Sequence, residues 1–228
     1  MLNTGNYTEN NNVVIAGTVA SELIFSHEVY EETFYTFMFD VPRLSEVKDV
    51  IKVTISEKFL SGIDLSVGSK VLIRGQFRSY NNFTNIGNKL ILTVFVKDVE
   101  ELNGYTEDVN ENSIYLNGYI CKQPVYRITP FGREIADILL AVNRSYNKSD
   151  YIPCIAWGRN AKFADSLKIG DNVIIKGRIQ SREYQKKISD TEVENKTAYE
   201  VSVSKLELNK DDTDGVDDIE ESFISDID

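Results

Sequence analysis

The sequence predicts an all-β protein made of two tandem five-stranded barrels, each with a short helix, followed by a disordered acidic tail. Three observations lead to this prediction. Several short segments alternate apolar and polar residues with the two-residue period of a β-strand. The pattern of the first half recurs about 101 residues later, for example where Gly17 recurs as Gly118. The composition then changes at Asp211, where acidic residues become dense.

The two repeats share one order of elements: two strands joined by a hairpin, a third strand, a short helix and two more strands. Residues 13–17 correspond to 114–118, 49–55 to 150–156, 67–77 to 169–179 and 90–99 to 197–206, with helices expected at 56–60 and 159–167. Five strands with a helix between the third and fourth predict the oligonucleotide-binding fold (OB-fold). Gly75 and Gly177 lie within strands, where a barrel requires a tight bend.

The repeats, a polar connector and the acidic tail divide the chain into five parts. We expect a disordered N-terminus at 1–10, a diverged OB-fold at 11–103, a linker at 104–112, a second OB-fold at 113–209 and a disordered tail at 210–228.

The net charge of −11 is unevenly distributed. Residues 1–105 carry −4, residues 106–209 carry +1 and residues 210–228 carry −8. Because binding depends on the local field more than on total charge, the acidic composition does not exclude a polyanionic partner for the second repeat.

The clearest strand of the second repeat predicts a cationic face. Val173, Ile175, Gly177 and Ile179 point to one side, and Lys176, Arg178, Gln180, Arg182 and Tyr184 point to the other. Cations interleaved with an aromatic residue suit single-stranded nucleic acid. An ordinary solvated strand face explains this segment equally well.

The preceding strand adds aromatic side chains to the same repeat. Ile152, Cys154 and Ala156 form a small apolar face, which places Tyr151, Pro153, Ile155 and Trp157 on the other face. Tyr146 lies just upstream in a polar loop. Exposed aromatic rings are what base stacking requires, although a tryptophan is also often buried in a core.

Residues 113–208 resemble the bacterial single-stranded DNA-binding protein family. The matching segments are LNG at 116–118, PVYRITPFGR at 124–133, LAVNR at 140–144, WGRNA at 157–161, IGDNV at 169–173, GRIQSR at 177–182 and TAYEV at 197–201. The order and spacing of these segments carry the resemblance, and residues 11–103 resemble a diverged copy of the same barrel.

The resemblance implies a function and a set of site residues. The family stacks bases on four aromatic positions, which here are Tyr146, Tyr151, Trp157 and Tyr184. We expect sequence-tolerant binding of single-stranded DNA that protects it during replication, recombination and repair. The expected phosphate contacts are Arg144, Lys148, Arg159, Lys176, Arg178, Arg182, Lys186 and Lys187.

The first repeat lacks these aromatic residues. Ser45, Val50, Ser56 and Asn82 stand at the four corresponding positions. We therefore expect the first barrel to act mainly as a scaffold, to dimerise or to bind DNA weakly, while the second barrel does most of the binding.

The resemblance also implies protein partners. The family ends in an acidic peptide with an apolar tip that recruits replication and repair proteins, and Ile219, Phe223, Ile224 and Ile227 are the candidate docking residues here. The terminal Pro-Phe of the family is absent. The family presents four barrels per particle, so this two-barrel chain is expected to form a homodimer.

Other classes of function fit less well. His27 is the only histidine and has no ligand-like neighbours, so we expect no catalytic residue, metal or cofactor. The sequence has no apolar run of about 20 residues and no secretory signal, which predicts a cytoplasmic, nucleoid-associated protein. Two alternatives remain: an RNA-binding OB-fold protein, and a primosome-type OB-fold interaction protein with weak DNA binding.

Overall fold

The computed structural model describes residues 10–43, 45, 47–84, 87–102, 110–146, 148–187 and 193–209. The predictions for residues 1–9, for most of the linker and for the acidic tail lie outside the described residues. The four candidate docking residues of the tail lie there too, as do the side chains of Lys186 and Lys187.

The first barrel is formed by β1 (Asn11–Val19), β3 (Glu32–Pro42), β4 (Lys48–Ser56), β5 (Lys70–Thr84) and β6 (Gly87–Glu101). β1 pairs with β5 on one side and with β3 on the other, and β4 closes the barrel by parallel pairing with β6. β2 (Ile24–Val29) extends the sheet beyond β3. A single turn of 3-10 helix, η1 (Glu57–Phe59), lies between β4 and β5, and the Ser56 side chain caps it.

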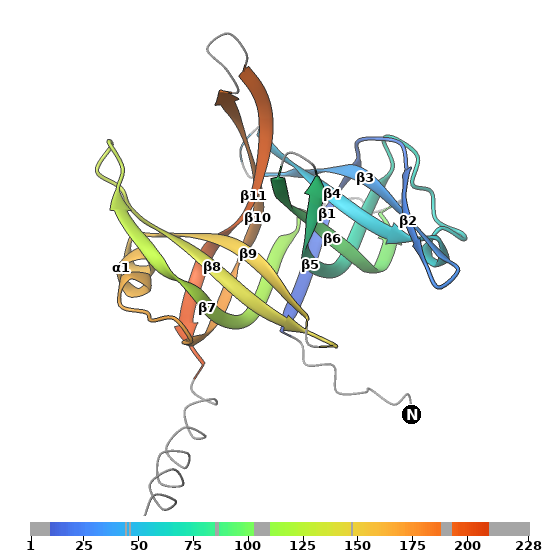
Figure 1. Cartoon of the computed structure of the whole chain (residues 1–228). Helices are drawn as coiled ribbons and strands as arrows, with labels where there is room; N and C mark the ends of the chain where they lie inside the picture. Colours follow the sequence, from blue (N-terminus) through green and yellow to red (C-terminus); the bar gives the residue numbers. More distant parts are fainter. Residues whose placement is uncertain are drawn as a thin grey trace, which may run out of the picture.

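The second barrel repeats this arrangement with β7 (Asn112–Ile128), β8 (Glu134–Arg144), β9 (Lys148–Trp157), α1 (Arg159–Asp165), β10 (Asn172–Lys187) and β11 (Val193–Leu208). β7 pairs with both β8 and β10, and β9 pairs with β11 in parallel. The predicted pair of OB-folds is confirmed (Figure 1). One detail differs between the barrels: β7 runs through two register shifts as one strand, whereas β1 and β2 are separate.

Two glycines mark the same bend in both barrels. The register shifts between Arg74 and Gly75 in the β5–β6 pair, and between Lys176 and Gly177 in the β10–β11 pair. A Cβ added to Gly75 would lie 2.3 Å from the carbonyl oxygen of Phe95, and one added to Gly177 would lie 2.2 Å from that of Ser202. The sharp bend predicted for these positions is therefore confirmed, and it requires glycine because the neighbouring backbone fills the space.

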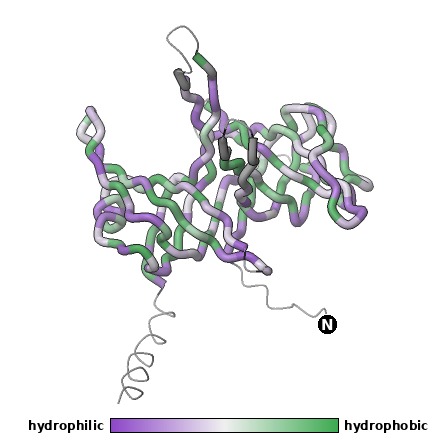
Figure 2. Tube along the Cα trace, in the orientation of Figure 1, coloured by the Kyte–Doolittle hydropathy of each residue, from purple (hydrophilic) through white to green (hydrophobic). Residues whose placement is uncertain are grey.

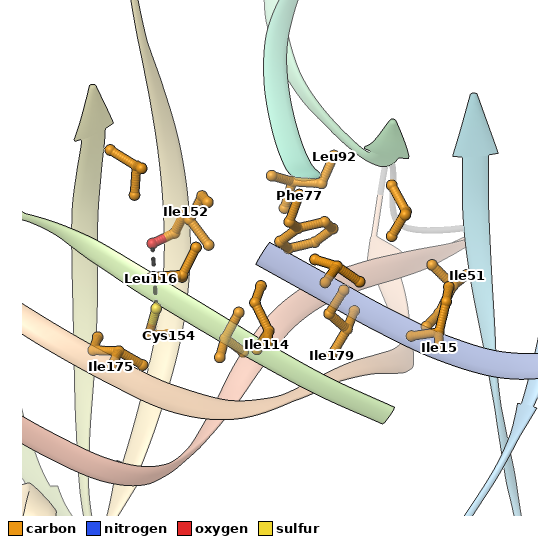
Figure 3. Close-up of a cluster of buried hydrophobic side chains, with 14 of the residues drawn as sticks. Ile15, Ile51, Phe77, Leu92, Ile114, Leu116, Ile152, Cys154, Ile175 and Ile179 are labelled. Carbon is orange, nitrogen blue, oxygen red and sulfur yellow. Dashed lines mark hydrogen bonds between the residues drawn. The ribbon is translucent and has the colours of Figure 1, made fainter. Parts of the chain in front are cut away.

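The core is continuous through both barrels. Apolar and polar residues alternate along the strands (Figure 2), and the inward set includes Val173, Ile175 and Ile179, each 0% exposed. Ile15 and Ile114 lie in the cluster drawn in Figure 3, which joins the two barrel interiors. Strand alternation predicted this set well, because the period of two places one face of each strand inside the barrel.

The two barrels join through β1 and β7. These strands pair antiparallel, with Val13 opposite Ile114 at the centre of an approximate twofold relation. Asn11 donates from Nδ2 to the carbonyl oxygen of Phe77 at 2.8 Å, and Asn112 makes the equivalent bond to Ile179 at 2.8 Å. The same local sequence pattern therefore forms the same contact twice, on the two sides of one junction.

A pair of buried aspartates connects the barrels a second time. The backbone N–H of Ser79 on β5 donates to Asp150 on β9 at 2.7 Å, and that of Ser181 on β10 donates to Asp49 on β4 at 2.7 Å. Both aspartates are at most 2% exposed. Buried carboxylates that accept backbone N–H groups resist separation, since pulling the barrels apart would leave both groups without partners.

In the described part of the chain, no helix has the length and apolar character needed to cross a membrane.

Candidate nucleic-acid interface

The turn between β8 and β9 presents an aromatic ring to solvent. Tyr146 has a backbone φ of +63° and is 94% exposed. The hairpin pairs Arg144 with Lys148, so the chain must reverse within three residues, and a left-handed residue makes that reversal possible. Tyrosine is an unfavourable choice there, because its Cβ crowds the following carbonyl oxygen. An exposed ring kept at a strained position is typical of a functional site.

Tyr146 lies on the rim of a hollow of about 580 Å³ between the barrels. Its loop and strand neighbours Arg144 and Lys148 line one side, and they come from the second barrel. The other side is formed by the first barrel, through Gln76 and Arg78 on β5 and Lys97 on β6. The twofold junction therefore brings cations from both repeats around one space.

The charges around this hollow are not balanced. Arg144 approaches the carboxylate of Asp150 at 3.6 Å, and Asp150 is the one acidic residue among the described residues that line the hollow. Burial, followed by repulsion from Arg144, lowers the pKa of Arg78 to about 10. Burial and repulsion from Arg78 also lower the pKa of Lys97. An anion in the hollow would relieve this repulsion, which makes it a favourable place for a phosphate group.

Several effects act on the pKa of Asp150 in opposite directions. Burial raises its pKa, while the hydrogen bonds from Ser79 and the nearby charges of Arg144 and Arg78 act in the other direction. Burial is the largest of these effects, and the pKa is raised overall. Asp150 is one carboxylate beside Arg78, Lys97, Arg144 and Lys148, so it compensates the cations of the hollow only in part.

The other predicted stacking residues are exposed but lie apart from this hollow. Tyr151 on β9 is 44% exposed and Tyr184 on β10 is 39% exposed. Trp157, at the end of β9, is 40% exposed and lines a separate hollow of about 570 Å³ with Arg159 of α1. Ile155, which strand alternation places on the same face as Tyr151 and Trp157, is only 8% exposed.

The cationic face of β10 is present on the structure. Lys176, Arg178 and Arg182 are exposed, and the first two alternate with buried Ile175 and Ile179. The guanidinium of Arg182 lies 6.0 Å from the ring centre of Tyr184. Both residues lie toward the far end of the β10–β11 hairpin, which projects away from the barrel in Figure 1. Contact of these residues with DNA stays a prediction.

The hollow around Tyr146 also contains residues of the first barrel that the sequence did not predict as site residues. Gln76 and Arg78 lie on the outer face of β5, and their alternation with buried Phe77 was visible in the sequence. Their position beside Arg144 was not, because it depends on how the two repeats dock. Lys97 lies at the register shift of β6, where strand alternation does not assign a face.

Metal-ligating and nucleophilic side chains are dispersed over the described residues. No three His, Cys, Asp or Glu side chains among them gather at a metal-binding spacing. Burial raises the pKa of the Cys121 and Cys154 thiols, which keeps both protonated and weakly nucleophilic at neutral pH.

A comparison with known protein families finds a match for the second barrel. Residues 111–209 match the model of the single-strand binding protein family. The match covers the second barrel and leaves the first barrel outside it. The predicted resemblance is thereby confirmed.

Individual relatives of this family agree. The chain is 37% identical over 81 residues to single-stranded DNA-binding protein A of Bacillus subtilis, which covers 32% of this chain and 47% of that protein. The single-stranded DNA-binding protein 2 of Listeria innocua is 37% identical over 93 residues, or 36% of this chain and 58% of that protein. The chain thus spans about half the length of the curated relatives it matches.

A solved structure extends the likeness to both barrels. A deletion mutant of the single-stranded DNA binding protein from Thermus aquaticus superposes with a TM-score of 0.70 at 19% identity, over 87% of this chain and 94% of that one. At this identity the likeness concerns the fold, and it covers the two-barrel arrangement. The N-terminal domain of PriB protein from Thermoanaerobacter tencongensis is 49% identical over 41% of this chain and 98% of that one, with a TM-score of 0.37.

Proposed function

We propose that this protein binds single-stranded DNA without strong sequence preference. The observation that carries the proposal is the hollow between the barrels, where an exposed, strained Tyr146 stands beside cations with one partly compensating carboxylate. The match of the second barrel to the single-strand binding protein family supports the same conclusion.

Binding uses stacking and charge together. Bases stack on Tyr146, Tyr151, Trp157 and Tyr184, each contributing about 1–3 kcal/mol, and every base offers a π face, so sequence matters little. Phosphates contact the predicted cations of the second barrel, with Arg144 and Lys148 nearest to Tyr146. Counterion release makes the affinity fall as salt rises, by about 0.7 log units per log unit of salt for each phosphate neutralised.

The biological role follows from sequence-tolerant binding. The protein coats single strands during replication, recombination and repair, in the cytoplasm at the nucleoid. Two copies form a homodimer that presents four barrels, and the acidic tail docks replication and repair proteins through its apolar residues.

The test is fluorescence anisotropy of a labelled oligo-dT at several salt concentrations, with a matched RNA oligonucleotide as competitor. We expect saturable binding with a negative salt slope and weaker competition by RNA. Equal or better competition by RNA would favour the RNA-binding alternative. Absence of binding to either nucleic acid at low salt would refute the proposal and favour an interaction protein.

A further inference from the structure

The outer face of the first barrel carries a hollow of its own. It has a volume of about 560 Å³ and is lined by residues of the β2–β3 hairpin, β4, β5 and β6, with Arg144 reaching in from the second barrel. The first barrel lacks the four family stacking positions, so this hollow is built from other residues.

Phe95 on β6 and Arg78 on β5 form a stacked platform in this hollow. The guanidinium carbon of Arg78 lies 3.7 Å from the centre of the Phe95 ring. Gln76 holds the guanidinium plane by accepting from Nη2 at 2.8 Å and from Nε at 3.2 Å. A guanidinium fixed in this way is a flat cation, and such a cation stacks well on a nucleobase.

Further aromatic rings surround the platform. Phe34 lies 5.7 Å from Phe95, and the ring of His27 stacks on Phe34 at 4.9 Å with an interplanar angle of 9°. His27 is exposed, and Tyr80, which follows Arg78 by two residues on β5, is 41% exposed. Rings at both ends of a cationic platform provide room for more than one base.

The two hollows share a pair of arginines. Arg78 and Arg144 line both of them, and each comes from a different barrel. Repulsion from Arg144 is also one of the causes that lower the pKa of Arg78, after burial. A phosphate between them would bridge the hollow of Tyr146 and the face of Phe95.

The other side of the twofold junction is built differently. Gln180 stands where Arg78 would be repeated, and its amide donates to Glu200 at 2.6 Å. Ser202 stands opposite Arg178 on β11, as Phe95 stands opposite Gln76 on β6. The counterpart of Arg144 is Arg43, which is held by Asp49 through two hydrogen bonds of 2.6 and 2.8 Å. Among the described residues, an arginine stacked on an aromatic ring beside a second arginine is therefore found on one side of the junction.

We propose that the outer face of the first barrel is a second nucleobase-stacking site, and that one DNA strand passes from Tyr146 across Arg144 and Arg78 onto Phe95. This inference rests on the proposed function and extends it. The first barrel is then part of the binding surface as well as a scaffold, and one chain occludes the nucleotides of two barrels along this path.

The test replaces the platform with the residues found at the corresponding positions of the second barrel, in the variant Arg78→Gln/Phe95→Ser. The matched control is Arg74→Gln on the same strand, which removes an equal charge from an arginine already paired with Asp98 and Glu100. The site size is measured by stoichiometric titration with poly(dT), and affinities are measured by anisotropy with labelled dT oligonucleotides of increasing length.

We expect the double variant to occlude fewer nucleotides per chain, by about the 4–16 that one OB-fold covers. Its salt slope for long oligonucleotides should be shallower by about 0.7, because one phosphate contact is lost. The Arg74→Gln control should match the unaltered protein throughout.

Two results would distinguish failure of the second stacking site from failure of the proposed function. If the unaltered protein binds DNA but the double variant has the same site size and salt slope, the second site is refuted and the proposed function stands. If the unaltered protein does not bind DNA, the proposed function itself fails. A thermal melt verifies folding, and Arg78→Lys, which keeps the charge without the flat platform, should weaken binding of long oligonucleotides at an unchanged salt slope.

Discussion

Replacing Tyr146 with asparagine should make the protein more stable and bind DNA less well. Asparagine tolerates the left-handed region far better than tyrosine, and the left-handed conformation costs an ordinary residue about 1–2 kcal/mol. The tyrosine ring is 94% exposed, so its removal loses almost no burial. We therefore expect a gain of about 1 kcal/mol, which raises Tm by roughly 2–4 °C for a domain of this size.

The same substitution removes a stacking ring. A stacked base contributes about 1–3 kcal/mol, so the affinity for oligo-dT should fall by roughly 5- to 150-fold. Thermal unfolding and anisotropy titration on the same preparation measure the two effects. Tyr146→Phe serves as the control, since it keeps both the ring and the backbone strain and should leave Tm and affinity nearly unchanged.

This test is specific because the substitution should raise stability while it lowers DNA affinity. A merely structural turn residue would change stability and leave DNA binding unaltered. If Tyr146→Asn binds oligo-dT as tightly as the unaltered protein, Tyr146 does not stack on bases. If Tm does not rise, the backbone strain at this position is not significant.

Three further predictions concern the junction and the barrel bend. Asp49→Asn should lower the free energy of unfolding in urea by about 3–5 kcal/mol, because it breaks the ion pair of buried Asp49 with Arg43. Asp150→Asn should lower it clearly less, because Asp150 lies 3.6 Å from Arg144 in a looser pair. Equal losses for the two variants would contradict this difference between the ion pairs. Burial raises the pKa of Asp150, so the folded state keeps the carboxyl proton above the unfolded pKa of about 4, and the contribution of Asp150 to stability falls as pH rises through the folded pKa. The stability of Asp150→Asn relative to the unaltered protein should therefore increase from pH 4 to pH 7. A constant difference between the two proteins would refute the raised pKa. Gly177→Ala should destabilise by about 1–3 kcal/mol, because its Cβ would meet the Ser202 carbonyl oxygen, and an unchanged unfolding midpoint would show that the bend can relax.

The sequence predicted what depends on local pattern. Alternation placed Val173, Ile175 and Ile179 inside the barrel and Tyr151 and Trp157 outside it, because strand faces follow a period of two. Gly177 identified the bend, since a glycine within a strand is typical of a place where the backbone bends or another strand approaches closely. These features needed no knowledge of how the barrels meet.

The remaining features depend on docking between the repeats. Ser79 and Asp150 are 71 residues apart and belong to different barrels, so no local pattern connects them. Arg78 was visible as an outward-facing residue of β5, but its position beside Arg144 follows only from the pairing of β1 with β7. The left-handed turn at Tyr146 was also hidden, because tyrosine gives no sequence signal for a positive φ.

The measurement that tests the central claim most directly is quenching of intrinsic fluorescence by oligo-dT at low and moderate salt. Trp157 is the only tryptophan of the chain, so its signal reports one place on the second barrel. We predict saturable quenching that weakens as salt rises. Unchanged fluorescence, together with unchanged anisotropy of a labelled oligo-dT, would contradict single-stranded DNA binding by this protein.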